Sequence, residues 1–334
     1  MDAAAEIGMV KEKDGLEIRD PGREKEVKAW FVSRGRSLGL DPAFSELLSE
    51  ALMSRAVNVQ LKGRRKDLRG KRALVVGGSG RMGAWLCRRL SNRGASVEVW
   101  DPRGALRGYP NVRDLGRAVG RADIIAVSSP PGACPEDLRA VLELRPEGLV
   151  FDICSVKSHI AGQLKAAARK GMKVTSAHPM FGPNASSPRG RTVIVCDCGS
   201  PRANREAEKL FGDAGATVVR SSLEKHDRLM AYVLGLPHAS VLVFGSVVSG
   251  SGTGLRDLVE AEGPSFERML GAAVEMSKES VRVYHDIQAL NPATKRMFKE
   301  LERALSAVER ASVAKDPAEF RKIMESMREH VEVS

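Results

Sequence analysis

A glycine-rich turn between two short apolar segments constrains the fold of this chain more than any other feature. Residues 73–76 form an apolar run that ends in valines, which is typical of a buried parallel strand. Gly78, Gly80 and Gly83 follow in Gly-x-Gly-x-x-Gly spacing, and residues 84–90 favour a helix. The first glycine permits a tight turn, the second lets a pyrophosphate approach the backbone, and the third lets the helix pack on the strand. Free N–H groups at the helix start favour the phosphates.

A carboxylate follows the second predicted strand, residues 97–100. Asp101 stands about 20 residues after the glycine turn, where an acid accepts hydrogen bonds from an adenosine ribose. This register predicts a dinucleotide site to which Arg81 and Met82 also contribute, and a structural turn without nucleotide is the alternative. Asp101 favours NAD because it would repel the 2′-phosphate of NADP. Arg103 could instead pair with that phosphate, so NADP stays possible.

The composition is that of a soluble globular protein with a basic balance. The 334 residues suffice for two or three domains, and 43% are hydrophobic and 28% charged. A net charge of +11 indicates anionic ligands. Aromatic residues make up only 4%, and no zinc-finger or RNA-recognition signature occurs, which argues against a nucleic-acid partner. The basic cluster in residues 62–72 is interpreted as part of a solvated linker, with a nucleic-acid patch as the alternative.

The five cysteines contain no Cys-x-x-Cys spacing, so we predict no metal site. Cys196 and Cys198 lie on one face of a predicted strand and are interpreted as apolar fillers. The N-terminus has no signal-peptide pattern. The longest apolar stretch, residues 239–248, is shorter than the roughly 20 residues that span a bilayer, so we predict no membrane partner. A reducing cytoplasm is the expected location.

Four segments follow one another in the chain. Residues 1–61 are helical in pattern, 62–70 form a basic linker, 71–225 alternate between strand and helix, and 226–334 favour helices. The predicted strands cover residues 73–76, 97–100, 124–128, 149–153, 173–176, 192–196 and 217–219.

This alternation predicts an α/β fold: a doubly wound, mostly parallel Rossmann sheet preceded by a short helical segment and followed by an all-helical domain. Helices are predicted over residues 227–250, 265–289 and 293–330, with breaks at Gly263-Pro264 and Asn291-Pro292. Apolar faces on these helices could pair with a second copy, so a homodimer is expected.

Two further polar residues follow predicted strands. Ser155 comes after residues 149–153, and His178 comes after residues 173–176 within AHPMFGP. Ligands of such sheets bind beyond the carboxyl ends of the strands, so we expect both side chains at that edge. A histidine with a near-neutral pKa can take a proton from a hydroxyl while hydride leaves the same carbon. Ser155 could orient the histidine or bind the substrate oxygen, and Lys157 could support the loop or an anion.

Several segments from residue 71 to the C-terminus resemble the prephenate dehydrogenases of tyrosine biosynthesis: DICSVKS, AHPMFGP, EKHDRLMAYVLGLPHA and NPATKRM. The resemblance implies a Rossmann domain that binds NAD or NADP, a helical domain that forms the dimer, and oxidative decarboxylation of prephenate to 4-hydroxyphenylpyruvate. It places the catalytic histidine on His178, the assisting serine on Ser155 and a substrate contact on His238. His226 matches a recurrent position and is interpreted as structural.

The chain departs from this family where a cation should bind the substrate carboxylate. The arginine is expected on the helix after GPSF, but none occurs between Arg268 and Arg282. Either of these could substitute, or either could be a solvated charge. The departure leaves arogenate open beside prephenate. A nucleotide-sensing binding protein is the non-enzyme alternative, although a sensor needs no proton acceptor at His178.

The first 61 residues resemble the all-helical chorismate mutases that are often fused to this dehydrogenase. The ligand-binding positions fall on Lys11, Asp20, Arg23, Glu24 and Ser54, and Asn58 stands where glutamine or glutamate is usual. A long first helix with two essential arginines is missing from the sequence, so chorismate carboxylates would lack partners. We therefore expect no mutase activity from this segment, and a bifunctional enzyme only if the true start lies upstream.

Overall fold

The computed structural model describes residues 7, 10–11, 20–62 and 67–332. The chain divides into two compact units, Met1–Lys71 with Arg88–Ser96, and Arg72–Cys87 with Val97–Ser334. Each unit is described by itself. Most of residues 1–19 of the predicted helical segment, and residues 63–66 of the predicted linker, lie outside the described residues.

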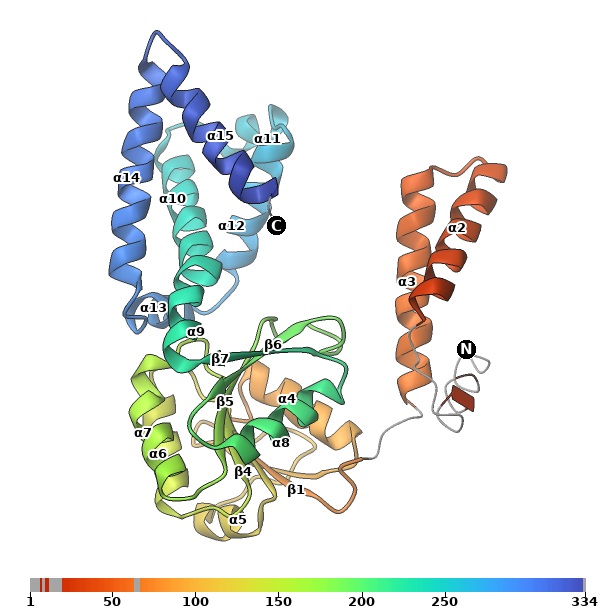
Figure 1. Ribbon diagram of the computed structural model, residues 1–334, viewed down its shortest axis with the longest axis vertical. Helices are drawn as coiled ribbons and strands as arrows, with labels where there is room; N and C mark the ends of the chain where they lie inside the picture. Colours follow the sequence, from red (N-terminus) through yellow and green to blue (C-terminus); the bar gives the residue numbers. More distant parts are fainter. Residues whose placement is uncertain (1–6, 8–9, 12–19, 63–66, 333–334) are drawn as a thin grey trace. The chain divides into compact units, whose positions relative to one another are not determined.

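The first unit contains a hairpin of two helices, α2 (Pro21–Ser37) and α3 (Pro42–Lys62) (Figure 1). Asp20 caps α2, because its Oδ1 accepts the N–H of Arg23 at 3.0 Å. Lys28 on α2 reaches across to α3 and pairs with Glu46 at 2.6 Å and Glu50 at 3.0 Å. The described part of residues 1–61, which the sequence predicts to be helical, therefore forms two helices joined by a turn at residues 38–41.

The second unit is built on a seven-stranded sheet in the order β2-β1-β3-β4-β5-β6-β7. The ladders from β1 through β3 and β4 to β5 are parallel, β5 and β6 are antiparallel, and β6 and β7 are again parallel. The sheet confirms the α/β class and the mostly parallel arrangement. The strands are β1 (Arg72–Val76), β2 (Ser96–Trp100), β3 (Ile124–Val127), β4 (Leu149–Asp152), β5 (Val174–Pro179), β6 (Thr192–Asp197) and β7 (Thr217–Ser222).

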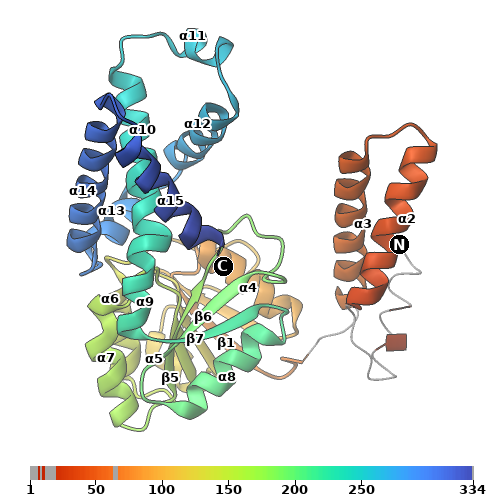
Figure 2. The ribbon, with the colours of Figure 1, turned by 45° about the horizontal axis from the view of Figure 1, so that its top comes forward.

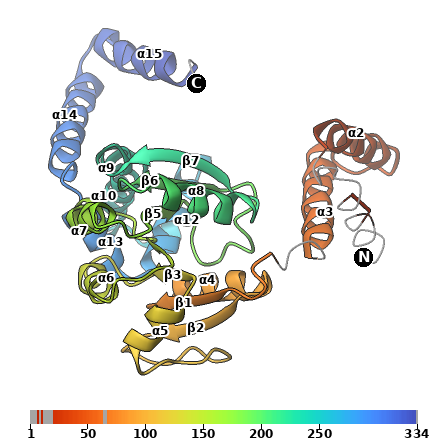
Figure 3. The ribbon, with the colours of Figure 1, turned by 60° about the horizontal axis from the view of Figure 1, so that its bottom comes forward.

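Helices cover both faces of this sheet (Figure 3). One face carries α5 (Leu115–Arg121), α6 (Cys134–Glu143) and α7 (Ser158–Arg169), and the other carries α4 (Arg81–Asn92) and α8 (Pro201–Gly212). The main core lies between the sheet and the first of these layers, where Leu138, Ile160 and Leu164 are fully buried against the strands. Burial on both faces explains why the central strands are almost wholly apolar.

The C-terminal half of this unit is helical. A continuous helix runs through α9 (Leu223–Met230), a π-helical turn η1 (Ala231–Gly235) and α10 (Leu236–Gly250). Around α10 pack α12 (Pro264–Ser277) and α14 (Thr294–Val313), as Figure 2 shows. The remaining helices are α11 (Leu255–Glu260), α13 (Val281–Ala289) and α15 (Ala318–Glu332).

Two of the predicted helices are wrong in length, because each is interrupted. The helix predicted over 265–289 is broken between α12 and α13, where Ser280 adopts an extended conformation before the first turn of α13. The helix predicted over 293–330 ends at Val313, and α15 starts only after Pro317. A proline disfavours the helical conformation of the residue before it, which explains the second break.

The long helix Leu223–Gly250 has 28 residues, and its most apolar 18-residue window has a mean hydropathy of 1.7, so by length and composition it could cross a membrane. The sequence prediction considered only residues 239–248 and therefore missed it. The start of this helix packs into the fold, since His226, Met230 and Ala231 are buried. Its later apolar residues Leu242, Val243 and Val247 are exposed.

Candidate active site

The glycine turn after β1 has the close packing that its spacing predicts. A Cβ on Gly83 would overlap the carbonyl oxygen of Gly77 and lie 2.7 Å from Cα of Gly78, so α4 can approach the turn only without a side chain. A Cβ on Gly78 would lie 2.7 Å from a methyl group of Val99. Gly80 is less confined, with its nearest neighbour at 3.3 Å, which leaves room at the position expected to face a pyrophosphate.

Gly77 is a further glycine that the motif does not include. Its φ is +74°, and a Cβ there would lie 2.8 Å from the backbone nitrogen of Ser129 after β3. Both the left-handed backbone and the close approach of the neighbouring strand require glycine at this position. The turn is thus fixed between the neighbouring parallel strands β1 and β3.

Asp101 follows β2 and is bound to the glycine turn. Its Oδ2 accepts the N–H of Ser79 at 3.0 Å and the Ser79 hydroxyl, and its Oδ1 accepts the N–H of Arg103 at 3.0 Å. Burial alone would raise the pKa of Asp101, but these hydrogen bonds lower it, so the carboxylate is ionised. The guanidinium of Arg103 is exposed, with its Nε 3.4 Å from the same carboxylate.

Arg81 and Met82 begin α4 directly after the glycine turn. Met82 is half-buried, whereas the exposed Arg81 pairs through Nη1 with Glu279 at 2.5 Å. Glu279 lies between α12 and α13, so one cation from the nucleotide-binding turn contacts the helical half of the same unit.

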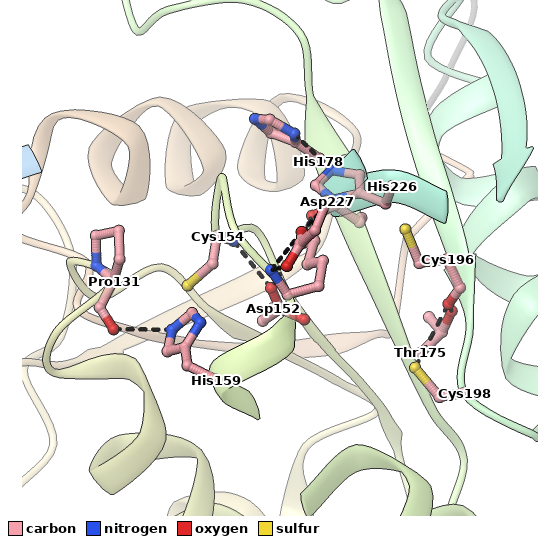
Figure 4. Close-up of polar contacts among 12 residues, drawn as sticks. Pro131, Asp152, Cys154, His159, Thr175, His178, Cys196, Cys198, His226 and Asp227 are labelled. Carbon is pink, nitrogen blue, oxygen red and sulfur yellow. Dashed lines mark hydrogen bonds and ion pairs between the residues drawn. The ribbon is translucent and has the colours of Figure 1, made fainter. Parts of the chain in front are cut away.

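A buried row of side chains connects β5 to α9 (Figure 4). His178 lies near the carboxyl end of β5, and its Nδ1 is 2.9 Å from Nε2 of His226. Nδ1 of His226 lies 2.8 Å from Oδ1 of Asp227. Both imidazoles are almost inaccessible, with 4% of His178 and 0% of His226 exposed. The sequence prediction placed His178 after its strand, but β5 continues through it because residues 176–179 pair with β6.

Asp227 also binds the start of α7. Its carboxylate accepts the backbone N–H groups of Lys157 and Ser158 at 2.9 and 2.7 Å, and the Ser158 hydroxyl at 2.5 Å. Burial alone would raise the pKa of Asp227, but the hydrogen bonds from His226 and Ser158 lower it. Asp227 is therefore ionised and can only accept hydrogen bonds.

The proton positions in the row follow from this carboxylate. Because Asp227 only accepts, Nδ1 of His226 carries its proton, and in a neutral ring Nε2 is then an acceptor. Nδ1 of His178 must donate to that acceptor, which leaves Nε2 of His178 with a free lone pair. Burial, followed by the charge of Lys157, holds the pKa of His178 well below 6.5, and burial also lowers that of His226. His178 is thus presented as a neutral proton acceptor.

Lys157 is fully buried with 0% of its surface exposed. Its Nζ donates to Oδ1 of Asp152 at 2.7 Å and to the carbonyl of Ala177 at 2.8 Å, joining β4 to β5 next to His178. Burial alone would lower the pKa of Lys157, but the negative charge of Asp152 raises it, so the side chain is a cation. Of the two roles considered for Lys157, this geometry favours support of the loop.

Ser155 lies in the loop between β4 and α7 and is partly exposed. Among the described residues, no hydrogen bond joins Ser155 to His178. Both nevertheless follow or end neighbouring parallel strands, so they share the edge of the sheet that also carries the glycine turn.

The helical half contributes the other residues singled out from the sequence. His238 on α10 is half-buried and packs against Tyr284 on α13, with the two rings tilted and their centroids 4.4 Å apart, and its Nδ1 is buried without a partner in the described structure. Arg282 on α13 lies 3.4 Å from Asp286, which accepts the N–H of Gly132 at 3.1 Å. Arg268 is exposed on α12. The structure thus brings Arg282, but not Arg268, to the loop after β3.

The N-terminal candidates lie mostly on the hairpin of the first unit. Asp20 caps α2, and Arg23 pairs with Glu26 at 2.7 Å while remaining exposed. Glu24 is part-buried, Ser54 on α3 is exposed, and Lys11 is part-buried. The side chain of Asn58 lies outside the described structure.

Sequence reasoning missed Asp227, which ends the buried row, and Asp152, which pairs with the buried Lys157. The signal available for Asp227 was the dipeptide His226-Asp227 at the start of an apolar helix, because an acid there is unusual unless it is paired.

Comparison with known proteins agrees with this geometry. Family models match residues 107–219 (prephenate dehydrogenase, nucleotide-binding domain), 222–326 (prephenate dehydrogenase, dimerization domain) and 1–61 (chorismate mutase type II). A 4-amino-4-deoxyprephenate dehydrogenase of Streptomyces pristinaespiralis is 30% identical over 275 residues, covering 78% of this chain and 92% of that protein.

A probable arogenate/prephenate dehydrogenase of Methanocaldococcus jannaschii is 26% identical over 268 residues, which cover 77% of this chain but only 60% of that protein. The crystal structure of prephenate dehydrogenase from A. aeolicus with hydroxyphenyl propionate and NAD+ has the same fold, with a TM-score of 0.64 and 20% identity over 78% of this chain and 98% of that one. From these matches, the chain belongs to the prephenate dehydrogenase family.

Proposed function

We propose that this protein is an NAD(P)-dependent dehydrogenase that oxidatively decarboxylates prephenate or a close analogue. The observation that carries the proposal is the row from Asp227 through His226 to His178, which leaves a neutral imidazole nitrogen free at the nucleotide-binding edge of the sheet. A bound nicotinamide would accept the hydride there.

In this proposal Nε2 of His178 takes the proton of the ring hydroxyl, which pushes electrons toward loss of hydride from the same carbon. Carbon dioxide then leaves as the ring becomes aromatic, giving 4-hydroxyphenylpyruvate from prephenate. Ser155 and His238 are proposed substrate contacts, and Lys157 holds β4 and β5 in place beneath the histidine. The buried cation also disfavours a proton on His178, so the base stays ready at neutral pH.

Gly78, Gly80, Gly83, Arg81 and Met82 are the proposed cofactor-binding residues of the turn. Asp101 supports NAD over NADP, because its ionised carboxylate is fixed at the end of β2 where a 2′-phosphate would be repelled. Arg103 is the group that could offset this repulsion. Kinetics with NAD and NADP for the wild type and for Asp101→Ala test the assignment, and the variant should gain relative preference for NADP.

The side chain of the substrate is expected to meet one of two candidate cations. Arg282 is the better placed of the two candidate cations, since it lies beside the loop after β3. Prephenate, arogenate and 4-amino-4-deoxyprephenate share the ring diene and differ in the side chain or the ring substituent. Steady-state kinetics crossing these three substrates with both cofactors will identify the preferred pair.

The His178→Asn variant tests the core of the proposal. We expect it to bind NAD as the wild type does but to lose about 10²–10⁴-fold in turnover, the usual contribution of a general base. His330→Asn, on the exposed C-terminal helix, is the matched control and should keep full activity. Turnover in His178→Asn equal to that of the wild type would refute the assignment of the base.

We also propose the division into residues 1–61, 71–225 and 226–334, with the last part forming a homodimer. The exposed apolar residues Leu242, Val243 and Val247 on α10 support this, and cytoplasm suits a chain with five free cysteines. Analytical ultracentrifugation measures the oligomeric state, which a Val247→Glu substitution should shift toward monomer.

A second candidate activity is chorismate mutase in the N-terminal segment, which the family-model match to residues 1–61 favours. The described hairpin keeps Arg23 exposed on α2 and therefore reachable by an anion. Conversion of chorismate to prephenate by the purified protein, and its loss in Arg23→Ala, would establish the activity. Absence of turnover would agree with the expectation from the sequence.

A further inference from the structure

Two buried thiols meet between the loops that follow β3 and β4. Cys134 is the first residue of α6 and is 0% exposed, and Cys154 follows β4 and is 4% exposed. All five cysteines are free thiols. The thiols of Cys134 and Cys154 interact directly, and this contact is the largest influence on the pKa of each.

An imidazole lies beside this pair. Nε2 of His159, on the first turn of α7, is 3.0 Å from the carbonyl oxygen of Pro131 (Figure 4). A carbonyl can only accept, so Nε2 carries the proton and Nδ1 of the neutral ring carries a lone pair. That Nδ1 is buried and has no hydrogen-bond partner in the described structure, yet His159 interacts with the thiol of Cys154 and lowers its pKa. A histidine nitrogen beside a thiol is the arrangement that activates cysteine nucleophiles.

The neighbouring His159 distinguishes Cys154 from Cys134. Its contact with Cys134 lowers the pKa of Cys154 to about 7 against the opposing effect of burial, with His159 and the charge of Lys157 also lowering it and Asp152 raising it. Burial instead raises the pKa of Cys196 to about 12 and raises that of Cys198 as well. Cys154 is 4% exposed and precedes the partly exposed Ser155 in the loop after β4.

We propose that Cys154 is a peroxide-reactive thiol and that Cys134 captures the oxidised form as a disulfide between the two loops. The Cys154 thiolate attacks one peroxide oxygen, the O–O bond breaks, and the departing hydroxide takes up a proton to give water and a sulfenic acid on Cys154. The Cys134 sulfur then attacks the Cys154 sulfur and the S–O bond breaks. The hydroxyl leaves with the Cys134 proton as a second water. Two thiols are oxidised by two electrons in total, and one hydrogen peroxide is reduced to two waters.

The disulfide would connect two loops with roles at the proposed active site. The loop after β4 carries Ser155, and the loop after β3 carries Gly132, whose N–H binds Asp286 on α13. Linking them would restrict both, so oxidation should lower dehydrogenase turnover. The predicted loss of dehydrogenase turnover rests on the proposed function, whereas the predicted disulfide between the two sulfurs does not.

The main experiment measures the cross-link itself. Fully reduced protein is treated with equimolar hydrogen peroxide, alkylated under denaturing conditions and digested for mass spectrometry. We expect a disulfide-linked peptide pair containing Cys134 and Cys154 that dithiothreitol separates, with Cys87, Cys196 and Cys198 recovered as alkylated thiols. Recovery of Cys134 and Cys154 as free thiols, or oxidation spread evenly over the five cysteines, would overturn the proposal.

Variants separate the two thiols and need no dehydrogenase activity as readout. In Cys134→Ala the sulfenic acid on Cys154 should persist and be trapped by dimedone, whereas Cys154→Ala should leave Cys134 unoxidised. His159→Gln should slow the oxidation of Cys154, and labelling that stays as fast as in the wild type would remove His159 from the scheme. If the reduced wild type shows turnover, peroxide should lower it reversibly in the wild type but not by the disulfide route in Cys134→Ala.

Discussion

Nδ1 of His178 and Nε2 of His226 lie 2.9 Å apart although 48 residues separate them in the chain. The contact continues to Asp227, which is ionised, so the direction of every hydrogen bond in the row is set from one end. The carboxylate thereby selects the tautomer of a ring that it does not touch. His226 is a positioning residue in this scheme, since it acts on the proposed base and not on the substrate.

Removing the nitrogen of His226 that accepts the hydrogen bond from His178 should therefore impair turnover more than the binding of substrate or NAD. We expect His226→Ala to lower kcat on the order of 10-fold to 10²-fold, at or below the usual contribution of a whole general base. KM and NAD affinity should change little. His226→Gln can still offer a carbonyl oxygen to Nδ1 of His178 and should recover part of the rate. Equal rates for the alanine and glutamine variants would indicate a purely structural residue.

The pH dependence of kcat/KM should show an acid limb below the ordinary histidine value of about 6.5. Burial and the charge of Lys157 lower the pKa of His178, so the ring stays neutral and able to accept a proton from neutral pH down past that value. Activity is lost only at the lower pH at which His178 of the folded protein takes up a proton. The unfolded chain takes up that proton at higher pH, so stability also falls with decreasing pH in this window. An acid limb above 6.5 would contradict the lowered pKa.

The buried pair of Lys157 and Asp152 should be costly to break. Lys157→Met leaves a carboxylate with 0% exposure without its cation, which typically costs about 3–5 kcal/mol of unfolding free energy. Substituting Asp152→Asn in the same chain should restore part of this loss. Arg202→Ala removes an exposed pair with Glu206 and is the control, with an expected cost below about 1 kcal/mol. Urea denaturation followed by tryptophan fluorescence compares the three.

Two glycines in helices should respond to alanine in opposite directions. A methyl group on Gly83 would overlap the backbone of the glycine turn, so Gly83→Ala should destabilise the protein by about 1–3 kcal/mol and weaken NAD binding. Gly162 on α7 has no atom within 4 Å of the new Cβ, so Gly162→Ala should stabilise by about 0.5–1 kcal/mol. NAD titrations and thermal unfolding of both variants test this contrast.

Local patterns were sufficient to predict the strands, the glycine turn and the positions of Asp101, Ser155 and His178 along the chain. They could not predict that β6 runs antiparallel to β5, although residues 180–191 hold no helix long enough for a parallel crossover. They also could not predict the roles of His226 and Asp227. Those roles depend on contacts between residues far apart in sequence, which only the assembled sheet and α9 bring together.

The π-helical turn η1 decides which way two histidines of one helix face. His226 and His238 are 12 positions apart (238 − 226), which at about 100° per residue would put them about 120° apart around a regular helix. The extra residue accommodated in Ala231–Gly235 takes up roughly 100° of that angle. The two rings are thereby turned toward the same side of the continuous helix. Deleting a single residue from this turn would restore the regular repeat with 11 positions between the histidines, about 20° apart, so both rings would keep the same side without the π-turn.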